Sequence, residues 1–191
     1  MARRGVRGRF TERQWIGRHE VGGGGGRHSK DGLDCYSQGI HNLANTPIEM
    51  IEMVYPLRFK CYEFLTDSCG SGKYRGGLGV RRDIEFLDKS GSLNTQFDKF
   101  KIAPFGLFGG GDGATGQLFL NPDAANEKKL RSKTVDCKLT HGDIVSIRTQ
   151  GGGAYGPAAE RTEAAIARDL REGKITPAAA LDAYGYDGSK Q

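Results

Sequence analysis

The fold is indicated by one stretch in which two alternating segments flank a glycine-rich loop. The first segment is Arg58-Phe59-Lys60-Cys61-Tyr62-Glu63-Phe64-Leu65, and the second is Val80-Arg81-Arg82-Asp83-Ile84-Glu85-Phe86-Leu87. Both alternate between apolar and polar residues, a period of two that is typical of half-buried β-strands. The loop between them is Asp67-Ser68-Cys69-Gly70-Ser71-Gly72-Lys73-Tyr74-Arg75-Gly76-Gly77-Leu78-Gly79. Because strand follows strand with no helical spacer, the stretch favours an antiparallel sheet.

Four further strands are expected after this stretch, each bounded by Gly, Asn, Asp or Pro: Leu93–Phe100, Gln117–Leu120, Val135–Leu139 and Asp143–Thr149. Together with the first two they form the body of the protein. The predicted fold class is therefore α+β, mostly antiparallel β and sandwich-like, with helices outside the sheet.

Helices are expected before the first strand and after the last one. Thr46 as N-cap, Pro47 at the first helical position and Glu49 completing a capping box predict a short helix near 47–54, before Pro56. The pattern of Ala158–Glu172 predicts a helix that ends at Gly173, and Thr176-Pro177 predicts another over Ala178–Tyr184, before Gly185. The last helix is too short to persist alone, so it must dock on this domain or on a partner.

Glycine is the compositional outlier, with 30 of the 191 residues against an average of roughly 7%. No Gly-X-Y period runs through the chain, which excludes collagen. Most glycines fall in four segments, 22–32, 70–79, 106–116 and 151–156, which favours tight turns and close backbone approach. The length fits one domain, divided into a basic arm (1–21), a glycine-rich β domain (22–157), a helical segment (158–186) and a tail (187–191).

The net charge of +5 is concentrated in one part of the chain. Residues 1–30 carry +6, so the rest is nearly neutral at −1. A basic arm can contact phosphates, but only Phe10 and Trp15 interleave with its charges, which favours a flexible or subunit-contacting tail over nucleic-acid binding. No apolar run is long enough to span a membrane or to form a signal peptide, and we predict a cytoplasmic protein without membrane contact.

Cysteines and metal-ligating residues form no standard signature. Cys35, Cys61, Cys69 and Cys137 contain no C-x-x-C pair, and we expect reduced thiols, mostly in or near the core. The only local cluster of potential metal ligands is His28, Asp31, Asp34 and His41. Its spacing matches no helix face, and solvated loop residues are the alternative interpretation.

Candidate substrate-binding residues lie in the glycine loops, where function is usually found. Asp67, Ser68 and Arg75 have the chemistry to orient a carbonyl or carboxylate, with Arg75 binding through both nitrogens. The alternative is that Asp67 and Ser68 bond their own backbone to hold a turn. No P-loop and no nucleophile elbow is present, and Cys69 would need a histidine brought close by folding to act as a nucleophile.

Five strings, taken in order, resemble one family. They are Asn45-Thr46-Pro47-Ile48-Glu49, Tyr55-Pro56-Leu57-Arg58, the glycine loop from Asp67 to Val80, Phe105-Gly106-Leu107-Phe108-Gly109-Gly110 and Gly151-Gly152-Gly153-Ala154-Tyr155-Gly156. From about Gly22 to Tyr186 the chain resembles the C-terminal part of the hydantoinase B/5-oxoprolinase family, which includes acetone and acetophenone carboxylase subunits. The resemblance adds Gly152, Gly153 and Tyr155 to the substrate-binding candidates, although the last string is also typical of a turn. The register of the family resemblance implies that the four glycine segments surround a shared site.

The resemblance implies chemistry shared between subunits. A hydantoinase A-type partner binds ATP and Mg and phosphorylates a carbonyl or enolate oxygen of a small-molecule substrate. The B-type subunit then hydrolyses a cyclic amide (hydantoin, oxoproline or lactam type) or carboxylates a ketone. Family members are generally several hundred residues long, with metal-ligating residues in an N-terminal half that has no counterpart here. The chain is thus expected to need the remaining B-type half, which holds the divalent metal, and to be inactive alone.

Two function classes remain open at this point. One is a subunit of an ATP-dependent cyclic amidohydrolase or ketone carboxylase, either as one piece of a split B-type subunit or as a truncated form. The other is a non-catalytic structural or regulatory subunit that uses its basic arm to bind an acidic partner or nucleic acid. The residues do not separate hydrolase from carboxylase, and they contain no complete catalytic set.

Overall fold

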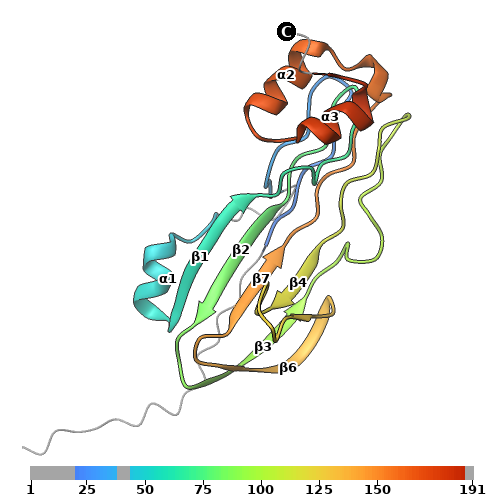
Figure 1. The fold of residues 1–191 in the computed structure, drawn as a ribbon. Helices are drawn as coiled ribbons and strands as arrows, with labels where there is room; N and C mark the ends of the chain where they lie inside the picture. Colours follow the sequence, from blue (N-terminus) through green and yellow to red (C-terminus); the bar gives the residue numbers. More distant parts are fainter. Residues whose placement is uncertain (1–19, 38–43, 188–191) are drawn as a thin grey trace, which may run out of the picture.

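A five-stranded antiparallel sheet forms the body of the computed structural model, which describes residues 20–37 and 44–187 (Figure 1). Its strand order is β1-β2-β7-β4-β5. The bounds of these strands are β1 Leu57–Phe64, β2 Val80–Phe86, β7 Ile144–Arg148, β4 Gln117–Leu120 and β5 Lys128–Lys129. The predicted mostly antiparallel fold is confirmed.

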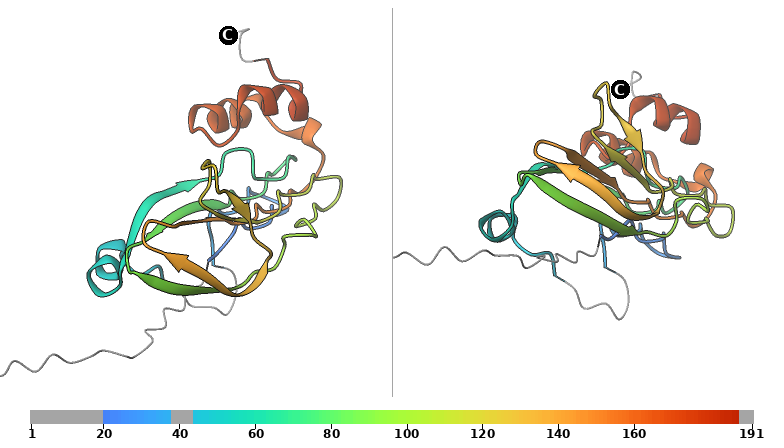
Figure 2. Two further views of the ribbon diagram at one scale, coloured as in Figure 1. Left: turned by 60° about the horizontal axis from the view of Figure 1, so that its bottom comes forward. Right: turned by 90° about the horizontal axis from the view of Figure 1, so that it is seen from below.

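A second layer is the antiparallel pair of strands β3 (Ser90–Gln96) and β6 (Lys133–Thr140), which lies across one face of the sheet (Figure 2). Buried apolar side chains of both layers form the main core: Ile84, Leu118, Leu130, Leu139, Val145 and Ile147. Side chains alternate between the two faces of a strand, which places the apolar residues on the face that is buried. Ile84 pairs with Val145 on the neighbouring strand, so their side chains point to the same face.

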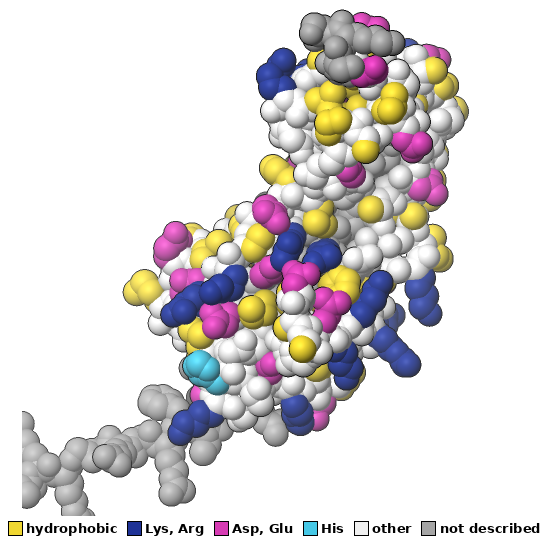
Figure 3. All heavy atoms as spheres, viewed as in Figure 1, with side chains coloured by type: hydrophobic (Ala, Val, Ile, Leu, Met, Phe, Trp, Pro, Cys, Tyr) yellow, Lys and Arg dark blue, Asp and Glu magenta, His cyan; other side chains and the backbone are white. Residues whose placement is uncertain are grey.

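Most strand boundaries lie within two residues of the prediction, and two differences are larger. The strand expected at Leu93–Phe100 begins at Ser90 and ends at Gln96, and beyond its end Phe97 and Phe100 stack on each other with ring centroids 5.4 Å apart. The strand β5 was not predicted, since Lys128 and Lys129 carry no apolar alternation. Exposed lysines on this short outer strand protect the sheet edge from pairing with other chains. Figure 3 shows lysine and arginine side chains along this side of the body.

The helix α1 (Ile48–Val54) lies against β1, and its predicted capping box is wrong. Pro47 itself occupies the N-cap position with ψ 136°, and no side chain caps the helix. Glu52 instead accepts a hydrogen bond from the Phe59 amide at 2.7 Å, which ties α1 to the outer edge of β1. The helix thus begins one residue later than the Thr46 signal predicted.

The C-terminal helices cap the opposite end of the molecule from α1 (Figure 1). The helix predicted over Ala158–Glu172 is divided into a 3-10 turn, η2 (Ala158–Glu160), and α2 (Glu163–Arg171). The break comes at Arg161 and Thr162, whose backbones are extended. The helix α3 (Pro177–Tyr184) confirms its prediction, since the Thr176 side chain accepts from the Ala179 amide and Gly185 ends the helix with φ 64°.

Two further sequence predictions concern the basic arm and membrane contact. The basic arm falls almost wholly within residues 1–19, outside the described ranges, and its role stays a prediction. Within the described part of the chain, no helix has the length and apolar character that crossing a membrane requires.

Candidate functional site

The four glycine segments meet between the sheet and the C-terminal helices. Segment 151–156 lies at their centre and forms hydrogen bonds with all three others. Gly153 accepts from the Gly26 amide at 2.8 Å, Gly152 donates to Gly77 at 2.8 Å, and Ala154 donates to Gly111 at 2.9 Å. Since a strand in a flat sheet has at most two neighbours, this arrangement is a bundle of extended segments. We call it the glycine bundle.

Bare backbone is a geometric requirement inside the glycine bundle. A Cβ atom on Gly152 would lie 1.9 Å from the Gly24 carbonyl oxygen, and one on Gly76 would lie 1.8 Å from the Gly152 carbonyl oxygen. Backbone cannot move away from such a contact as a flexible side chain can. The high glycine content therefore follows from close approach of chain segments, as the sequence predicted.

A buried cluster of charges holds the glycine bundle to the helix α2. We call Asp31, Asp34, Arg75, Arg161 and Asp169 the ion cluster. Arg75 bonds Asp34 at 2.9 Å and Asp169 at 3.2 Å. Arg161 bonds Asp31 at 2.8 Å and also bonds Asp169. The cluster joins glycine segments 22–32 and 70–79 to α2, and both arginine side chains are buried.

The cluster shifts the titration of its carboxylates. Burial by itself would raise the pKa of Asp34, but hydrogen bonds from the Arg75 guanidinium and the Leu78 amide outweigh it, so the pKa lies below its ordinary value of 3.8. The pKa of Asp31 is lowered in the same way, with burial opposed by hydrogen bonding and charge from Arg161. Both carboxylates are therefore ionised at neutral pH.

This shift predicts an acid-sensitive fold. The unfolded chain takes up protons first, so the stabilisation by Asp34 is present above pH 3.8 and is lost as the pH falls through the lower folded-state pKa. We expect Asp34→Asn to show a shallower loss of unfolding free energy below pH 3.8 than the unmodified protein. Urea unfolding at a series of pH values measures how the free energy of unfolding changes with pH. Asp98→Asn, at an exposed position, is the matched control and should follow the unmodified slope. Equal slopes for all three proteins would contradict the assignment.

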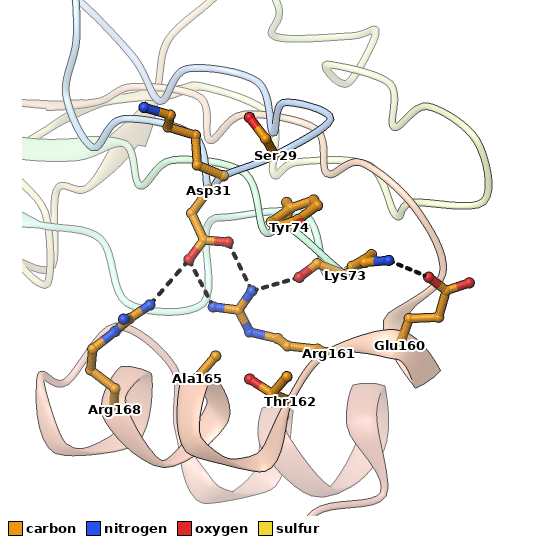
Figure 4. A pocket seen from close by; sticks show the side chains of 10 residues that line it. Ser29, Asp31, Lys73, Tyr74, Glu160, Arg161, Thr162, Ala165 and Arg168 are labelled. Carbon is orange, nitrogen blue, oxygen red and sulfur yellow. Dashed lines mark hydrogen bonds and ion pairs between the residues drawn. The ribbon is translucent and has the colours of Figure 1, made fainter.

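A polar hollow of about 290 Å³ lies over the ion cluster (Figure 4). Asp31 points toward Arg161 and Arg168 in this view, and Lys73 pairs with Glu160 at 2.9 Å. Apart from Lys30, the charged side chains that line the hollow thus already have partners within the chain. A second hollow of about 360 Å³ lies beside Tyr36, Phe105 and the glycines of segment 151–156.

The structure gives three predicted substrate-binding residues contacts within the fold. Ser68 is buried, donates to the Leu65 carbonyl at 2.6 Å and accepts from the Gly79 amide. Asp67 accepts from the Thr176 amide at 2.7 Å, ahead of α3. Arg75 is the centre of the ion cluster. The contacts of Ser68 agree with the interpretation that it holds a turn. In this structure the side chains of Asp67, Ser68 and Arg75 all bind other parts of the fold.

The other predicted residues, Gly152, Gly153 and Tyr155, belong to segment 151–156 of the glycine bundle. Gly152 and Gly153 line the second hollow, although both residues are largely buried. Tyr155 forms backbone hydrogen bonds with Tyr74, and its ring lies 5.1 Å from that of Phe108. Their role in substrate binding stays a prediction.

The predicted metal cluster is divided in the structure. Asp31 and Asp34 each bind an arginine, His28 is exposed, and His41 lies outside the described residues. No group of three or more potential metal ligands occurs within residues 20–37 and 44–187. The described donor set therefore does not fit a metal ion.

The model of the family described as hydantoinase B/oxoprolinase matches residues 3–158. The chain belongs to this family. Because the match covers most of the chain, it includes all four glycine segments and the strands of both layers.

Individual relatives support the assignment. The chain is 36% identical over 180 residues to the putative B subunit of a D-/L-hydantoinase from Pseudomonas sp. (strain NS671), and this covers 93% of the chain and 30% of the relative. It is 30% identical over 190 residues to the beta subunit of the Pseudomonas jessenii caprolactamase, covering 90% of the chain and 31% of the relative. The chain thus spans less than a third of these relatives, and the coverage fits a C-terminal portion.

Solved structures share the fold of this hydantoinase B-type chain. The ATP-dependent caprolactamase of Pseudomonas jessenii matches with a TM-score of 0.77 and 26% identity, covering 90% of this chain and 31% of that one. Nucleotide-free acetone carboxylase matches with a TM-score of 0.71 over 87% of this chain and 26% of that one, but at 19% identity it shows the fold alone. These relatives are enzymes or enzyme subunits with ATP-dependent chemistry.

Sequence reasoning missed two members of the ion cluster of this hydantoinase B-type chain. Arg161 and Asp169 were assigned to an ordinary amphipathic helix. One signal was present, because Asp169 lies three residues after Ile166, on the stripe of α2 that is buried. A carboxylate on a buried stripe needs a cationic partner, but the sequence did not indicate which arginines supply it.

Cys69 of this hydantoinase B-type chain packs beside the small apolar cluster of the C-terminal helices. Burial raises the pKa of its thiol to about 11, and the nearby positive charge of Arg75 lowers it only in part. A thiol with a raised pKa is a poor nucleophile at neutral pH. The four cysteines are all free thiols, as predicted, but each is only partly buried.

This raised pKa predicts slow alkylation of Cys69 in the folded protein. At pH 9 the thiolate fraction at a pKa of about 11 is roughly 50-fold lower than at the ordinary value of 9.0, so iodoacetamide should react about 50-fold more slowly than in the urea-unfolded chain. Mass spectrometry of the peptide containing Cys69 measures the rate. Equal rates in the folded and unfolded states would show that the thiol is not protected.

Proposed function

We propose that this chain acts as the C-terminal portion of a B-type subunit in an ATP-dependent assembly that opens a cyclic amide ring. The observation that carries the proposal is the 36% identity to a putative hydantoinase B-type relative over 93% of the chain. The caprolactamase beta subunit, at 30% identity over 90% of the chain, supports the same substrate class. Ketone carboxylation receives less support, since acetone carboxylase is similar at the level of the fold.

The proposal divides the chemistry among three parts. An A-type partner binds ATP with Mg and phosphorylates the carbonyl oxygen of the amide, which makes that oxygen a good leaving group. The remaining B-type region supplies the divalent metal. Assigning the metal to that region is supported by Asp31 and Asp34, since both carboxylates are already paired with arginines here.

The contribution of this chain is a rigid frame for the site. Hydrogen bonds in three directions hold segment 151–156, and the ion cluster fixes α2 to the bundle. A frame of this kind keeps loops from a second region in fixed positions, which is what a site needs to orient a substrate. We assign the reacting groups to the other parts of the assembly, so activity requires all of them.

The substrate class is tested by reconstituting the chain with its A-type partner and the remaining B-type region. ADP release is measured with hydantoin, 5-oxoproline and caprolactam, and in parallel with acetone plus bicarbonate. We expect one of the cyclic amides to stimulate ADP release and to yield a ring-opened product. Stimulation by acetone and bicarbonate alone, or by none of the four substrates, would contradict the proposal.

A further inference from the structure

A loop beside the glycine bundle exposes an unusual number of large apolar side chains. We call residues 102–108 the apolar loop. Its exposed side chains, with their exposed fractions, are Ile102 at 74%, Phe105 at 67%, Leu107 at 46% and Phe108 at 75%. Single exposed apolar residues are common on protein surfaces, but four within seven residues indicate a surface that is covered in the working protein.

The apolar loop is held in place by its backbone. Leu107 donates to the Ala154 carbonyl at 2.8 Å and accepts from the Gly156 amide at 2.9 Å, so segment 151–156 fixes it from two sides. Position 106 has no room for a side chain, because a Cβ on Gly106 would lie 2.1 Å from the Gly110 carbonyl oxygen. A loop fixed in this way cannot fold its apolar side chains inward. It presents them in a preorganised form, which lowers the entropic cost of binding.

Phe108 has a backbone conformation that side chains of its kind rarely adopt. Its φ is 51°, in the left-handed region that favours glycine or asparagine. Such a conformation costs of order 1–3 kcal/mol and persists where the surroundings fix it, often at binding sites. The Phe108 ring contacts only one other aromatic ring in the described chain, that of Tyr155. The backbone strain thus serves to display the ring rather than to bury it.

The second hollow adjoins the apolar loop and is suited to an inserted side chain. Phe105, Pro104 and Tyr36 line it together with the glycine backbone of segments 22–32 and 151–156, and Glu20 and Lys99 also belong to its lining. Its volume is about 360 Å³. Interfaces of high affinity commonly have a central pocket of this type, into which a large apolar residue of the partner enters.

Charge is absent from the apolar loop itself. No charged residue occurs from Ile102 to Gly111, and Lys101 and Asp112 bound the uncharged run. An apolar centre with a charged rim is the usual anatomy of a protein–protein interface. It does not suit nucleic acid, which requires a cationic surface.

We infer that the apolar loop and the adjoining hollow form the surface on which the remaining B-type region docks, with an apolar side chain of that region inserted between Phe105 and Tyr36. The inference rests on the proposed function. The length of the relatives indicates which partner covers the apolar loop. Roughly 70% of each matched relative lies outside the portion that this chain spans. That region must contact this portion, and the apolar loop offers it a preorganised apolar surface.

The test is binding between the full chain and the B-type region from the same genome, produced as a separate polypeptide. Phe105→Ser and Phe108→Asn remove the exposed rings, and asparagine retains the left-handed backbone at 108. We expect each of these two substitutions to raise the dissociation constant at least about 30-fold, the usual effect at the centre of an interface. Val135→Ser removes an apolar side chain that is 82% exposed on β6, and this control should change binding less than about threefold.

Circular dichroism and thermal unfolding establish whether each variant is folded. If Phe105→Ser or Phe108→Asn does not fold, Ile102→Ser is tested in its place. Binding unchanged in the loop variants would overturn the inference, while leaving the proposed function in place. No binding of the unmodified chain would overturn the proposed function as well. If this chain formed a homodimer and Phe108→Asn dissociated it, the apolar loop would bind a second copy of the chain. That result would also overturn the inference.

Discussion

Asp169→Asn is expected to lower the free energy of unfolding by about 3–5 kcal/mol, the usual cost of removing one partner from a buried charge pair. Asp169 is 0% exposed and accepts hydrogen bonds from both Arg75 and Arg161. Asparagine has one acceptor oxygen for these two guanidinium groups, and its NH₂ group would face one of them. Both arginines would then stay buried with too little compensating charge.

The effect should centre on the attachment of the C-terminal helices. The apolar cluster beneath them is small, with only Ile166, Ile175 and Ala180 buried. The ion cluster therefore contributes much of the energy that holds α2 to the glycine bundle. Urea unfolding followed by circular dichroism measures the change. Asp182→Asn, an exposed aspartate on α3, is the control and should shift stability by less than about 0.5 kcal/mol. Equal stability of both variants would show that the cluster is not a structural tie.

Gly152→Ala is expected to destabilise the fold by at least about 3 kcal/mol, at the upper end of the range for overpacked interiors. The added methyl group would lie 1.9 Å from the Gly24 carbonyl oxygen, and the other nearest atoms are also backbone, which cannot move aside as a flexible side chain can. The matched control is Gly25→Ala in the same bundle, where the nearest atom would be 3.8 Å away. This control should stay within about 0.5 kcal/mol of the unmodified protein.

Thermal unfolding of the two alanine variants tests the glycine bundle directly. If both variants melt at the temperature of the unmodified protein, the segments are not packed as closely as the structure has them. If both are strongly destabilised, loss of glycine flexibility at any position would explain the result without close packing. Only a large difference between positions 152 and 25 agrees with the bundle.

The sequence predicted those parts of the fold that depend on local patterns. Alternation identified β1 and β2, and the Thr176 cap and Gly185 stop identified α3. Thr46 gave a similar cap signal but was wrong, because Pro47 took the N-cap position with an extended backbone. Local chemistry permits both outcomes, and tertiary packing of α1 on β1 decides between them.

The candidate site was predicted less well, because it depends on contacts between distant residues. The register of the family resemblance predicted that the glycine segments lie around a shared site. Asp34, Arg75 and Asp169 lie far apart in the chain, and their pairing emerges only when the bundle forms. The apolar loop was visible in the sequence as Phe105 and Phe108, each followed by a glycine, but its exposure could not be derived from that pattern.

The central claim is that this chain is a required part of a cyclic-amide hydrolase assembly. Ring opening is measured with the A-type partner and the remaining B-type region, with and without this chain, using the cyclic amide that stimulates ADP release most. We predict ring-opened product and ADP in equal amounts when the chain is present, and no ring-opened product when it is omitted. Ring opening at the same rate without this chain would contradict the claim.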